Sequence, residues 1–453
     1  KEIWKLAYPV ALLTLMQRIG SIFEGILLSV HSTEELTISS ICGPYISIIT
    51  TVSYGLAISV NVVMAKIFKN PDRKKDAGDI LKGILLLTFI LGILISVVVS
   101  TRLYFEFADM TNLRKTAYLY MVPYLLGNPV ILLYSILIAA FRGLGDSKTG
   151  MWMTFIAVPI QVGTAYLLYK LFGFIVLGYG MILSRITGCV YGILQYNRYN
   201  LTVFTHSKVT ISRALIQEFV KLAAPISLSK VISPIANVVL NQIMLAMGTN
   251  LVAVAGLGNR LSLLFYLPAT AVGSAAVTLI AGNNDYKERK QLIKQLCVTS
   301  VLPTIVIIIV AFFVRGQLSQ MLTADAAMQQ AGKVYWTISL WAYPFVAIEM
   351  TMTSVLQALG YGFPTLAITI VRLLGVQIPL TYLARYANLG AKGVWGAYVV
   401  SNVVSMSVSV VWGIKKMKGR KIRIRQGVKG WLLALAMVLS LCSGWKQDVC
   451  AQQ

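Results

Sequence analysis

The most constraining feature of this sequence is a series of long apolar runs separated by short polar segments. A helix that crosses a membrane needs about 20 consecutive apolar residues, and these runs are too long for the buried strands of a β protein. The sequence therefore predicts an all-α polytopic membrane protein with 12 transmembrane helices. The runs cover residues 6–30, 38–68, 80–99, 117–141, 151–172, 174–196, 222–247, 251–281, 292–314, 334–359, 363–383 and 394–414.

The composition excludes most soluble proteins. Of the 453 residues, 57% are hydrophobic and only 12% are charged, whereas soluble domains average about 25% charged residues. A soluble protein this apolar would lack the polar surface needed to cover itself. We therefore expect the protein to lie in the lipid bilayer, and we expect it to be a monomer.

Positive charge is concentrated in the segments between the runs. The formal net charge is +24, and basic clusters follow the second, fourth, eighth and twelfth runs and separate the sixth from the seventh. Basic loops stay in the cytoplasm, so the sequence predicts an inner (plasma) membrane protein with both termini cytoplasmic. No nucleic-acid partner is expected, because the sequence contains no RNP, helix-turn-helix or zinc-finger pattern.

Residues for metal binding or catalysis are sparse. The five cysteines show no CxxC or other metal-ligand spacing, and the two histidines are far apart in the chain. The HExxH, P-loop and GxSxG patterns are absent. We therefore predict no metal site, no catalytic residues and no enzyme activity, and we expect energy from an ion gradient rather than from ATP.

The two halves of the chain resemble each other. Lys5–Val10 is similar to Lys221–Ile226, and Arg142–Gly145 aligns with Gln357–Gly360, at an offset near 215 residues. This offset indicates duplication of a six-helix unit, and an even number of helices gives both copies the same orientation, as in transporters with a site between two lobes. The predicted organisation is two pseudo-symmetric six-helix lobes at 1–200 and 221–418, a cytoplasmic linker at 201–220, and a basic tail with a short apolar segment at 419–453.

A family resemblance is found in the segment that follows the fourth run. Phe141–Thr149 reads FRGLGDSKT, which resembles the RGxGDxKxP signature of the multidrug and toxic compound extrusion (MATE) transporters of prokaryotic type. The matching positions are Arg142, Gly143, Gly145, Asp146 and Lys148. The resemblance covers residues 5–418 and implies export of organic cations or drugs, coupled to H⁺ or Na⁺, by alternating access.

Two glutamates inside the runs are candidates for ion coupling. A charged residue at the membrane centre costs at least ~2.5–3.5 kcal/mol, so each one requires an explanation. Glu24 in the first run falls where the resemblance places a proton- or sodium-responsive acid, and Glu349 lies in the tenth run, where family members often have an acid. The structural alternatives are an ion pair of Glu24 with Arg18, and a helix-interface role for Glu349 beside Arg372.

Further residues in the runs are candidates for lining a substrate cavity between the lobes. The polar ones suit hydrogen bonds to a substrate or between helices, and an aromatic side chain can stack on a planar cation. The candidates are Arg18, Asn237, Asn241, Gln242, Arg260, Arg372 and Tyr343. The seventh run contains no acid, which argues against a simple transfer of a sodium site from the family.

The arginines within or near the runs leave an alternative function open. Arg18, Arg185, Arg260 and Arg372 would repel a cationic drug unless they are paired, whereas an arginine suits a phosphate or carboxylate group. The alternative is a flippase of lipid-linked saccharides from the same superfamily. It predicts a cavity wall rich in arginine and poor in acid, whereas pairing of arginines with the two glutamates would remove this argument.

Overall fold

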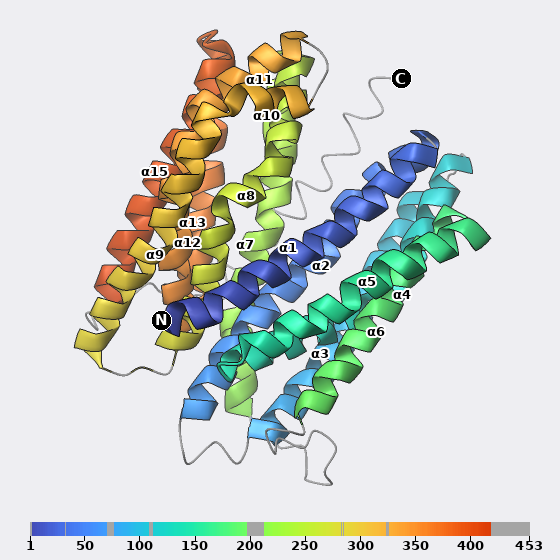
Figure 1. The fold of residues 1–453 in the computed structure, drawn as a ribbon, viewed down its shortest axis with the longest axis vertical. Helices are drawn as coiled ribbons and strands as arrows, with labels where there is room; N and C mark the ends of the chain where they lie inside the picture. Colours follow the sequence, from blue (N-terminus) through green and yellow to red (C-terminus); the bar gives the residue numbers. More distant parts are fainter. Residues whose placement is uncertain are drawn as a thin grey trace. The chain divides into compact units, whose positions relative to one another are not determined.

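The structure is a computed structural model of the chain, and every regular element that it describes is a helix. The description covers residues 2–31, 33–69, 77–107, 112–196, 213–281, 283, 285–322 and 326–417. Figure 1 shows the course of the chain. We refer to residues 2–196 as the N-terminal half and to residues 213–417 as the C-terminal half.

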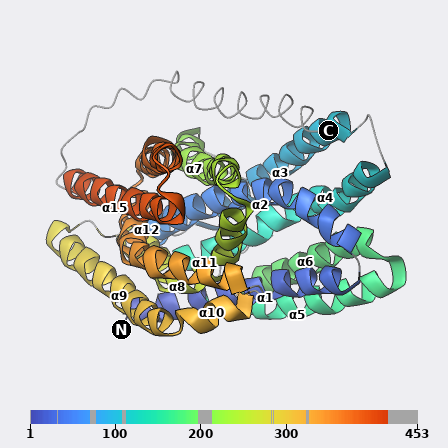
Figure 2. The ribbon, with the colours of Figure 1, turned by 90° about the horizontal axis from the view of Figure 1, so that it is seen from above.

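The helices of the N-terminal half coincide with the first six apolar runs. They are α1 (Glu2–His31), α2 (Thr33–Lys69), α3 (Ala77–Phe107), α4 (Asn112–Gly143), α5 (Ser147–Phe172), the 3₁₀ turn η2 (Phe174–Val176) and α6 (Leu177–Tyr196). Helix α5 packs along both α1 and α6, and Figure 2 shows these three helices side by side. Helix α4 is central, because it packs against α2, α3 and α6.

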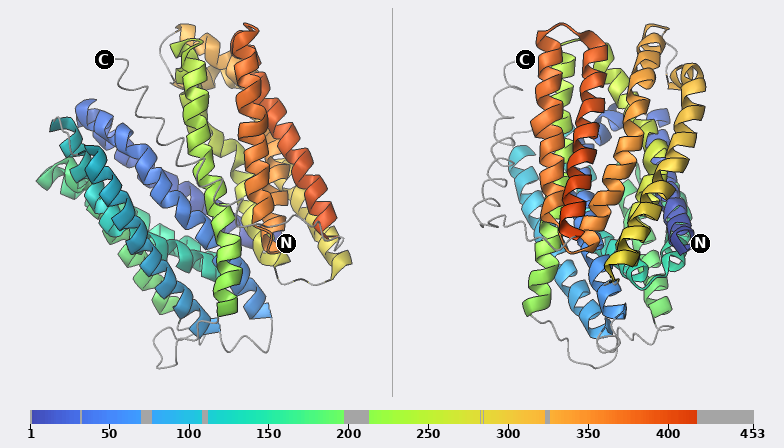
Figure 3. Two further views of the ribbon diagram at one scale, coloured as in Figure 1. Left: turned by 180° about the vertical axis from the view of Figure 1, so that it is seen from behind. Right: turned by 90° about the vertical axis from the view of Figure 1, so that its left-hand side faces the viewer.

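The helices of the C-terminal half follow the other six runs with more interruptions. They are α7 (Arg213–Leu245), α8 (Thr249–Ile280), α9 (Tyr286–Phe313), α10 (Arg315–Leu322), α11 (Ala326–Ser339), η4 (Leu340–Ala342), α12 (Tyr343–Ala358), α13 (Phe363–Ile370), η5 (Val371–Gln377), α14 (Ile378–Tyr386) and α15 (Gly390–Met417). Helix α7 lies beside α13 and α14, as Figure 3 shows, and α12 packs between α8 and α9.

Nine helical stretches in the described residues are long and apolar enough to cross a membrane. The tenth run is not among them, because the 3₁₀ turn Leu340–Ala342 divides it just before Pro344, which lacks a backbone N–H for the helix ladder. The first run is also not among them, and the eighth qualifies only as a shorter apolar helix, Leu264–Ile280. The prediction of 12 spans is therefore supported for nine.

The distribution of buried and exposed surface is that of a membrane protein. The most apolar stretches, in α3 and α9, bury only 22% and 28% of their residues, whereas the less apolar stretch in α4 buries 78%. A soluble protein would hide its most apolar helices in the core. Here these helices expose rows of large side chains, such as Leu94, Val97 and Val98 on α3, which is favourable only against lipid.

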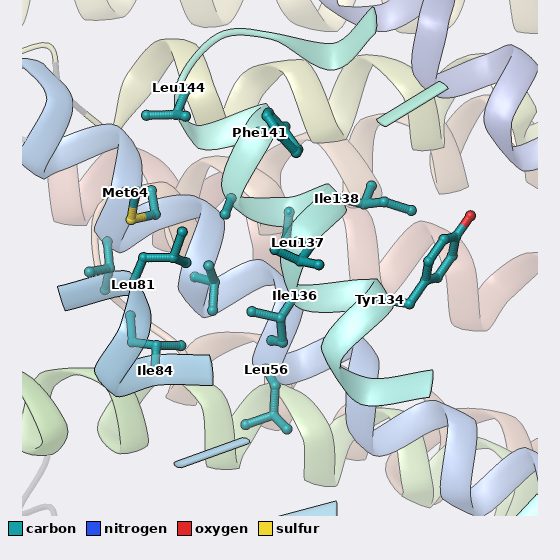
Figure 4. Close-up of a cluster of buried hydrophobic side chains, with 14 of the residues drawn as sticks. Leu56, Met64, Leu81, Ile84, Tyr134, Ile136, Leu137, Ile138, Phe141 and Leu144 are labelled. Carbon is teal, nitrogen blue, oxygen red and sulfur yellow. The ribbon is translucent and has the colours of Figure 1, made fainter. Parts of the chain in front are cut away.

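The core of the N-terminal half lies where α2, α3 and α4 meet. Figure 4 shows this cluster, in which Leu56 and Met64 of α2 and Leu81 and Ile84 of α3 pack around residues of α4. Phe141 of α4 is fully buried and lies 4.2 Å from the ring of Tyr196 on α6, centroid to centroid. This packing fixes the C-terminal end of α4, where the signature segment begins.

Three features of the C-terminal half were not predicted from the sequence. The short helix α10 follows α9 directly and packs against α11. The break at η4 interrupts the tenth run, and the segment Val371–Gln377 inside the eleventh run is a π-helix. Because a π-helix hydrogen-bonds i to i+5 and has an apolar sequence like an α-helix, periodicity alone does not reveal it.

Residues 1–413 form one compact unit in which both halves contact each other. The halves contact each other mainly through α2 with α7 and through α1 with α8. Residues 201–212 of the predicted linker (201–220) lie outside the described residues, and the rest of it belongs to α7, which begins at Arg213. The predicted tail at 419–453 lies entirely outside the described residues.

Candidate functional site

The signature segment forms a tight turn between α4 and α5. The N–H of Gly145 donates to the carbonyl of Arg142 at 2.9 Å, and the N–H of Asp146 donates to that of Phe141 at 2.9 Å, which is a Schellman arrangement. Gly145 has φ +84°, a conformation that favours glycine. The Asp146 carboxylate accepts the N–H of Thr149 at 3.1 Å and so caps α5.

The same turn is found in the other half of the chain. Gly360 follows Gly145 by 215 residues in the sequence and also has positive φ, at +87°. Its N–H donates to the carbonyl of Gln357, and that of Tyr361 donates to the carbonyl of Leu356, both at 2.9 Å. The repeat seen in the sequence is therefore a repeat of backbone geometry.

The arginine of the signature contacts the C-terminal half. Nη1 of Arg142 donates to Oγ of Ser274 on α8 at 3.1 Å. Oγ1 of Thr278, one turn later on α8, lies 3.1 Å from the carbonyl oxygen of Arg142 and 3.1 Å from Oδ1 of Asn61 on α2. Asn61 and Thr278 are both buried. The turn thus joins α2 and α4 of one half to α8 of the other.

The other signature residues are local in their contacts. Gly143 is buried against Met64 of α2. Lys148 is exposed at the start of α5. Among the five signature positions, Arg142 provides a hydrogen bond to the other half.

A second contact between the halves joins α2 to α7. Oγ of Ser227 on α7 donates to the carbonyl of Val52 at 3.2 Å. Gly55 of α2 lies so close to Ser227 that a Cβ at this position would collide with its backbone and hydroxyl. One turn further along α7, Nζ of Lys230 lies 4.6 Å from the ring centroid of Tyr54, within the range of a cation–π contact.

Glu349 of α12 lies in the polar centre of the C-terminal half. Its side chain is 9% exposed, and its carboxylate forms no ion pair or hydrogen bond within the described part of the chain. Glu349, Arg372 and Tyr266 of α8 lie in the neighbourhood of Tyr398 on α15. Glu349 and Arg372, both predicted from the sequence, therefore lie near the same tyrosine. No ion pair between the two is found among the described residues.

Aromatic side chains of α8, α11, α12 and α15 pack together in the C-terminal half. Tyr343 of α12 is buried, and its ring lies 4.9 Å from that of Phe265 on α8. The ring of Tyr335 lies 4.8 Å from that of Trp336 and 4.8 Å from that of Trp395. Tyr335, Tyr398 and Tyr266 lie in the neighbourhood of Tyr343.

Arg372 is positioned by the π-helix. It is the second residue of η5, and Gln377 is the last. Nε of Arg372 and Oε1 of Gln377 are both buried and have no hydrogen-bond partner among the described residues. A π-helical segment is frequently found at a functional site, and here it contains two buried polar groups without a hydrogen-bond partner among the described residues.

A contact between Arg185 and Tyr134 in the N-terminal half was only partly predicted from the sequence. Arg185 of α6 is 9% exposed, and its guanidinium carbon lies 4.6 Å from the ring centroid of Tyr134 on α4. The Tyr134 hydroxyl lies 2.9 Å from Oγ1 of Thr154 on α5. Arg185 was recognised as an arginine within a run, but its tyrosine is 51 residues away in the sequence, and no spacing rule links the two.

The remaining predicted residues fall into two groups, four that are exposed and two whose side chains the structure does not describe. Arg18 of α1 is exposed, as are three polar residues of α7, namely Asn237, Asn241 and Gln242. Glu24 lies on α1 and Arg260 on α8, but both side chains are outside the described residues. In the described part of the chain, no cluster of three or more His, Cys, Asp or Glu side chains could hold a metal ion.

Comparison with known proteins identifies relatives of the chain. The MatE family model matches it twice, at residues 9–167 and 225–383. The chain is 24% identical over 382 residues to the protein named "Probable multidrug resistance protein YoeA" of Bacillus subtilis, an alignment that covers 79% of this chain and 80% of the relative. It is 22% identical over 337 residues to "Probable multidrug resistance protein NorM" of Thermotoga maritima, covering 70% and 71%.

The fold is also similar to that of solved structures. One is described as the outward-facing conformation of a multidrug resistance MATE family transporter of the MOP superfamily. The TM-score is 0.85 at 21% identity, and the match covers 93% of this chain and 96% of the solved one. At this identity the comparison shows a shared fold.

Proposed function

Because the chain belongs to the MatE family of multidrug efflux transporters, we propose that it is an ion-coupled secondary exporter of organic cations. In this proposal the 12 apolar runs form two pseudo-symmetric six-helix lobes, at 1–200 and 221–418, which alternate access to a site between them. The two separate family matches, at 9–167 and 225–383, support the duplication. The repeated turns at Gly145 and Gly360 support it independently.

The observation that most supports cation export is the environment of Glu349. In the described part of the chain the Glu349 carboxylate has no ion pair, and Tyr398 lies in its neighbourhood. Such a group is suited to an organic cation, since aromatic faces attract cations and the acid supplies a full charge. The same carboxylate can exchange a proton or bind Na⁺. Binding of one cation and release of the other at Glu349 would couple substrate to ion.

Arg372 has a defined role in this proposal. Arg372 and Glu349 both lie in the neighbourhood of Tyr398. The positive charge of Arg372 therefore disfavours binding of an organic cation whenever the Glu349 carboxylate is neutral. Protonation of Glu349 would therefore expel a bound organic cation both by loss of attraction and by the remaining positive charge. Glu24 is retained as a second proposed coupling residue on the basis of the sequence resemblance.

We also propose an orientation and a location. Both termini are proposed to lie on the cytoplasmic side of the inner (plasma) membrane, and the basic segments after α2, α8 and α15 support this through the positive-inside rule. The contact of Arg142 with α8 then lies toward the cytoplasm, so the structure corresponds to a state closed on that side. The protein is proposed to act as a monomer.

Transport in liposomes tests the proposal. The purified protein is reconstituted, a proton or sodium gradient is imposed at several external pH values, and uptake of a fluorescent organic cation is followed. We expect Glu349→Gln to lower gradient-driven uptake at least about tenfold, equivalent to about 1.4 kcal/mol. Glu288→Gln, which removes an exposed carboxylate at the start of α9, serves as the matched control and should transport like the parent.

Two results would contradict the proposal. If Glu349→Gln transports like the parent at every pH and in both gradients, coupling at Glu349 is wrong, and the same comparison with Glu24→Gln tests the second residue. If the liposomes translocate a lipid-linked saccharide and no organic cation, the flippase alternative replaces export. The gradient that drives uptake identifies the coupling ion.

A further inference from the structure

Helix α15 has a polar face that is buried in the C-terminal half and an apolar face that is exposed. Asn402, Ser405 and Ser409 are each 0% exposed, whereas Val400 and Val411 are 46% and 51% exposed. A helix in a membrane turns its apolar face to lipid and its polar side chains to the interior of the bundle. The polar face of α15 therefore belongs to the interior of the protein.

This polar face is a continuous row. Its residues follow each other at intervals of three or four, which places them on one side of a helix. With a rise of 1.5 Å per residue, neighbours in the row are separated by about 4.5–6 Å along the axis. The row consists of Trp395, Tyr398, Asn402, Ser405, Ser409 and Trp412.

Four atoms of the row are buried and have no hydrogen-bond partner among the described residues. They are Nε1 of Trp395, Oδ1 of Asn402, Oγ of Ser405 and Nε1 of Trp412. The amide nitrogen of Asn402, by contrast, donates to the carbonyl of Tyr398 at 2.7 Å. Buried polar atoms almost always have a partner in protein or in ordered water, so these four atoms point to a ligand along the row.

Water is the ligand whose chemistry fits all four atoms. A metal ion would suit the oxygens of Asn402 and Ser405 but not the indole N–H groups, and an anion would suit the N–H groups but not the Asn402 oxygen. Water donates and accepts. Two hydrogen bonds of about 2.8 Å bridge groups about 5 Å apart, which matches the spacing of the row.

The row runs past the helix that carries Glu349. At one end the Trp395 ring lies 4.8 Å from that of Tyr335 on α11. Near the other end Gly413 lies against Cε of Met352 on α12, where a Cβ would collide. Met352 follows Glu349 by three residues in α12 and therefore shares its side of the helix. Helix α12 thus turns the side that carries Glu349 toward α15.

Several titratable or charged groups lie near this place. Arg372 of η5 and Tyr266 of α8 share the neighbourhood of Tyr398 with Glu349, and Sγ of Cys297 on α9 lies 4.0 Å from Sδ of Met352. Glu349 is the carboxylic acid among these groups, so it is the one suited to exchange a proton with water in the row.

From this geometry we propose that the polar row of α15 binds a single file of ordered waters, which conducts protons between Glu349 and the C-terminal end of the helix. Chains of polar groups and water relay protons inside membrane proteins. With the orientation proposed above, this end of α15 is cytoplasmic, and the file releases the coupling proton there. The role in proton release rests on the proposed function, whereas binding of the water file does not.

Radiolytic hydroxyl labelling of the full chain in nanodiscs detects the water file. A short X-ray pulse converts water into hydroxyl radicals that modify the nearest side chains, and mass spectrometry locates the modification. Trp395 and Trp336 are matched probes, because they are 5% and 1% exposed and each ring lies 4.8 Å from that of Tyr335. We expect Trp395 to be modified at least about fivefold faster than Trp336, since buried water lies beside it.

Variants test the conduction of protons. Ser405→Val and Asn402→Leu are close in size to the parent residues and interrupt the row. We expect each to lower modification of Trp395 and to slow proton-driven uptake of the organic cation at least about tenfold. Equilibrium binding of that cation should stay unchanged, which separates a blocked proton path from a damaged substrate site. Ser407→Val is the matched control, because Ser407 is exposed on the same helix and bonds only to its own backbone.

Each outcome decides a part of the proposal. If Trp395 is modified no faster than Trp336, the water file is wrong, whatever the transport assay shows. If Trp395 is modified rapidly but both interrupting variants keep the proton-driven uptake of the parent, or if sodium alone drives uptake, the role in proton release is wrong. If the parent takes up no organic cation in any gradient, the proposed function fails, and labelling still decides whether the row binds water.

Discussion

At the scale of single residues, Arg142 shows what a motif reveals and what it omits. Its place in the signature was visible in the sequence, but its partners Ser274 and Thr278 lie more than 130 residues further along the chain. Serine and threonine are common in membrane helices, and nothing in their spacing distinguished these two. The glutamates were conspicuous because a charge among apolar residues is rare, whereas a pairing across the fold requires the structure.

Thr278 is expected to matter more than its size suggests. Its hydroxyl lies within hydrogen-bond distance of both Asn61 and the Arg142 carbonyl, so Thr278→Val leaves buried polar groups unsatisfied. Such a loss costs about 1–3 kcal/mol, and the midpoint of thermal unfolding in detergent should fall accordingly. Thr337→Val, which removes an exposed hydroxyl bonded only to its own helix, is the control. Equal effects of the two variants would exclude a special role for Thr278.

At the scale of elements, the sequence predicted helices at all twelve apolar runs, because hydrophobic runs of this length leave few alternatives. It did not predict the interior of the tenth and eleventh runs. The 3₁₀ turn at Leu340–Ala342 and the π-helix at Val371–Gln377 depend on backbone hydrogen bonding, which apolar composition does not encode. The 3₁₀ turn directly precedes α12, which carries Glu349, and the π-helix contains Arg372.

The turn between α4 and α5 is the element whose sequence requirement is clearest. Gly145 has φ +84° and open space around the position of a Cβ, so Gly145→Ala introduces backbone strain without a collision. We expect a loss of about 1–2 kcal/mol in stability. Gly163→Ala also meets open space but lies in the helical backbone of α5, and alanine should stabilise it by about 0.5–1 kcal/mol. Opposite signs in thermal unfolding confirm the assignment, and a loss at both positions contradicts it.

At the scale of the whole molecule, duplication was predictable but the contact between the copies was not. An offset near 215 residues was visible in four short segments, and the turns at Gly145 and Gly360, which are separated by this offset, have the same backbone geometry. The residues that join the halves, such as Asn61, Gly55 and Ser227, have no counterpart in that pattern. These contacts are made by a few small or polar residues, which leave little trace in a sequence.

Alternating access makes a prediction about this contact. If the halves separate near Arg142 in each cycle, a covalent bridge between Asn61 and Thr278, whose side chains lie 3.1 Å apart, must stop transport. The experiment places Asn61→Cys and Thr278→Cys in a chain whose native cysteines are replaced, and joins them with a short bifunctional thiol reagent. We expect export of the organic cation to cease and to return on reduction of a cleavable bridge.

A bridge within one half is the matched control. Ser96 of α3 and Asn128 of α4 lie 3.2 Å apart, oxygen to nitrogen, and both belong to the N-terminal half. A lobe that moves as a unit keeps this distance through the cycle, so Ser96→Cys with Asn128→Cys should bridge without loss of transport. If the Asn61–Thr278 bridge forms and export continues at the parent rate, the halves do not separate at Arg142. If both bridges stop export, the movement involves the interior of the N-terminal half and not a rigid lobe.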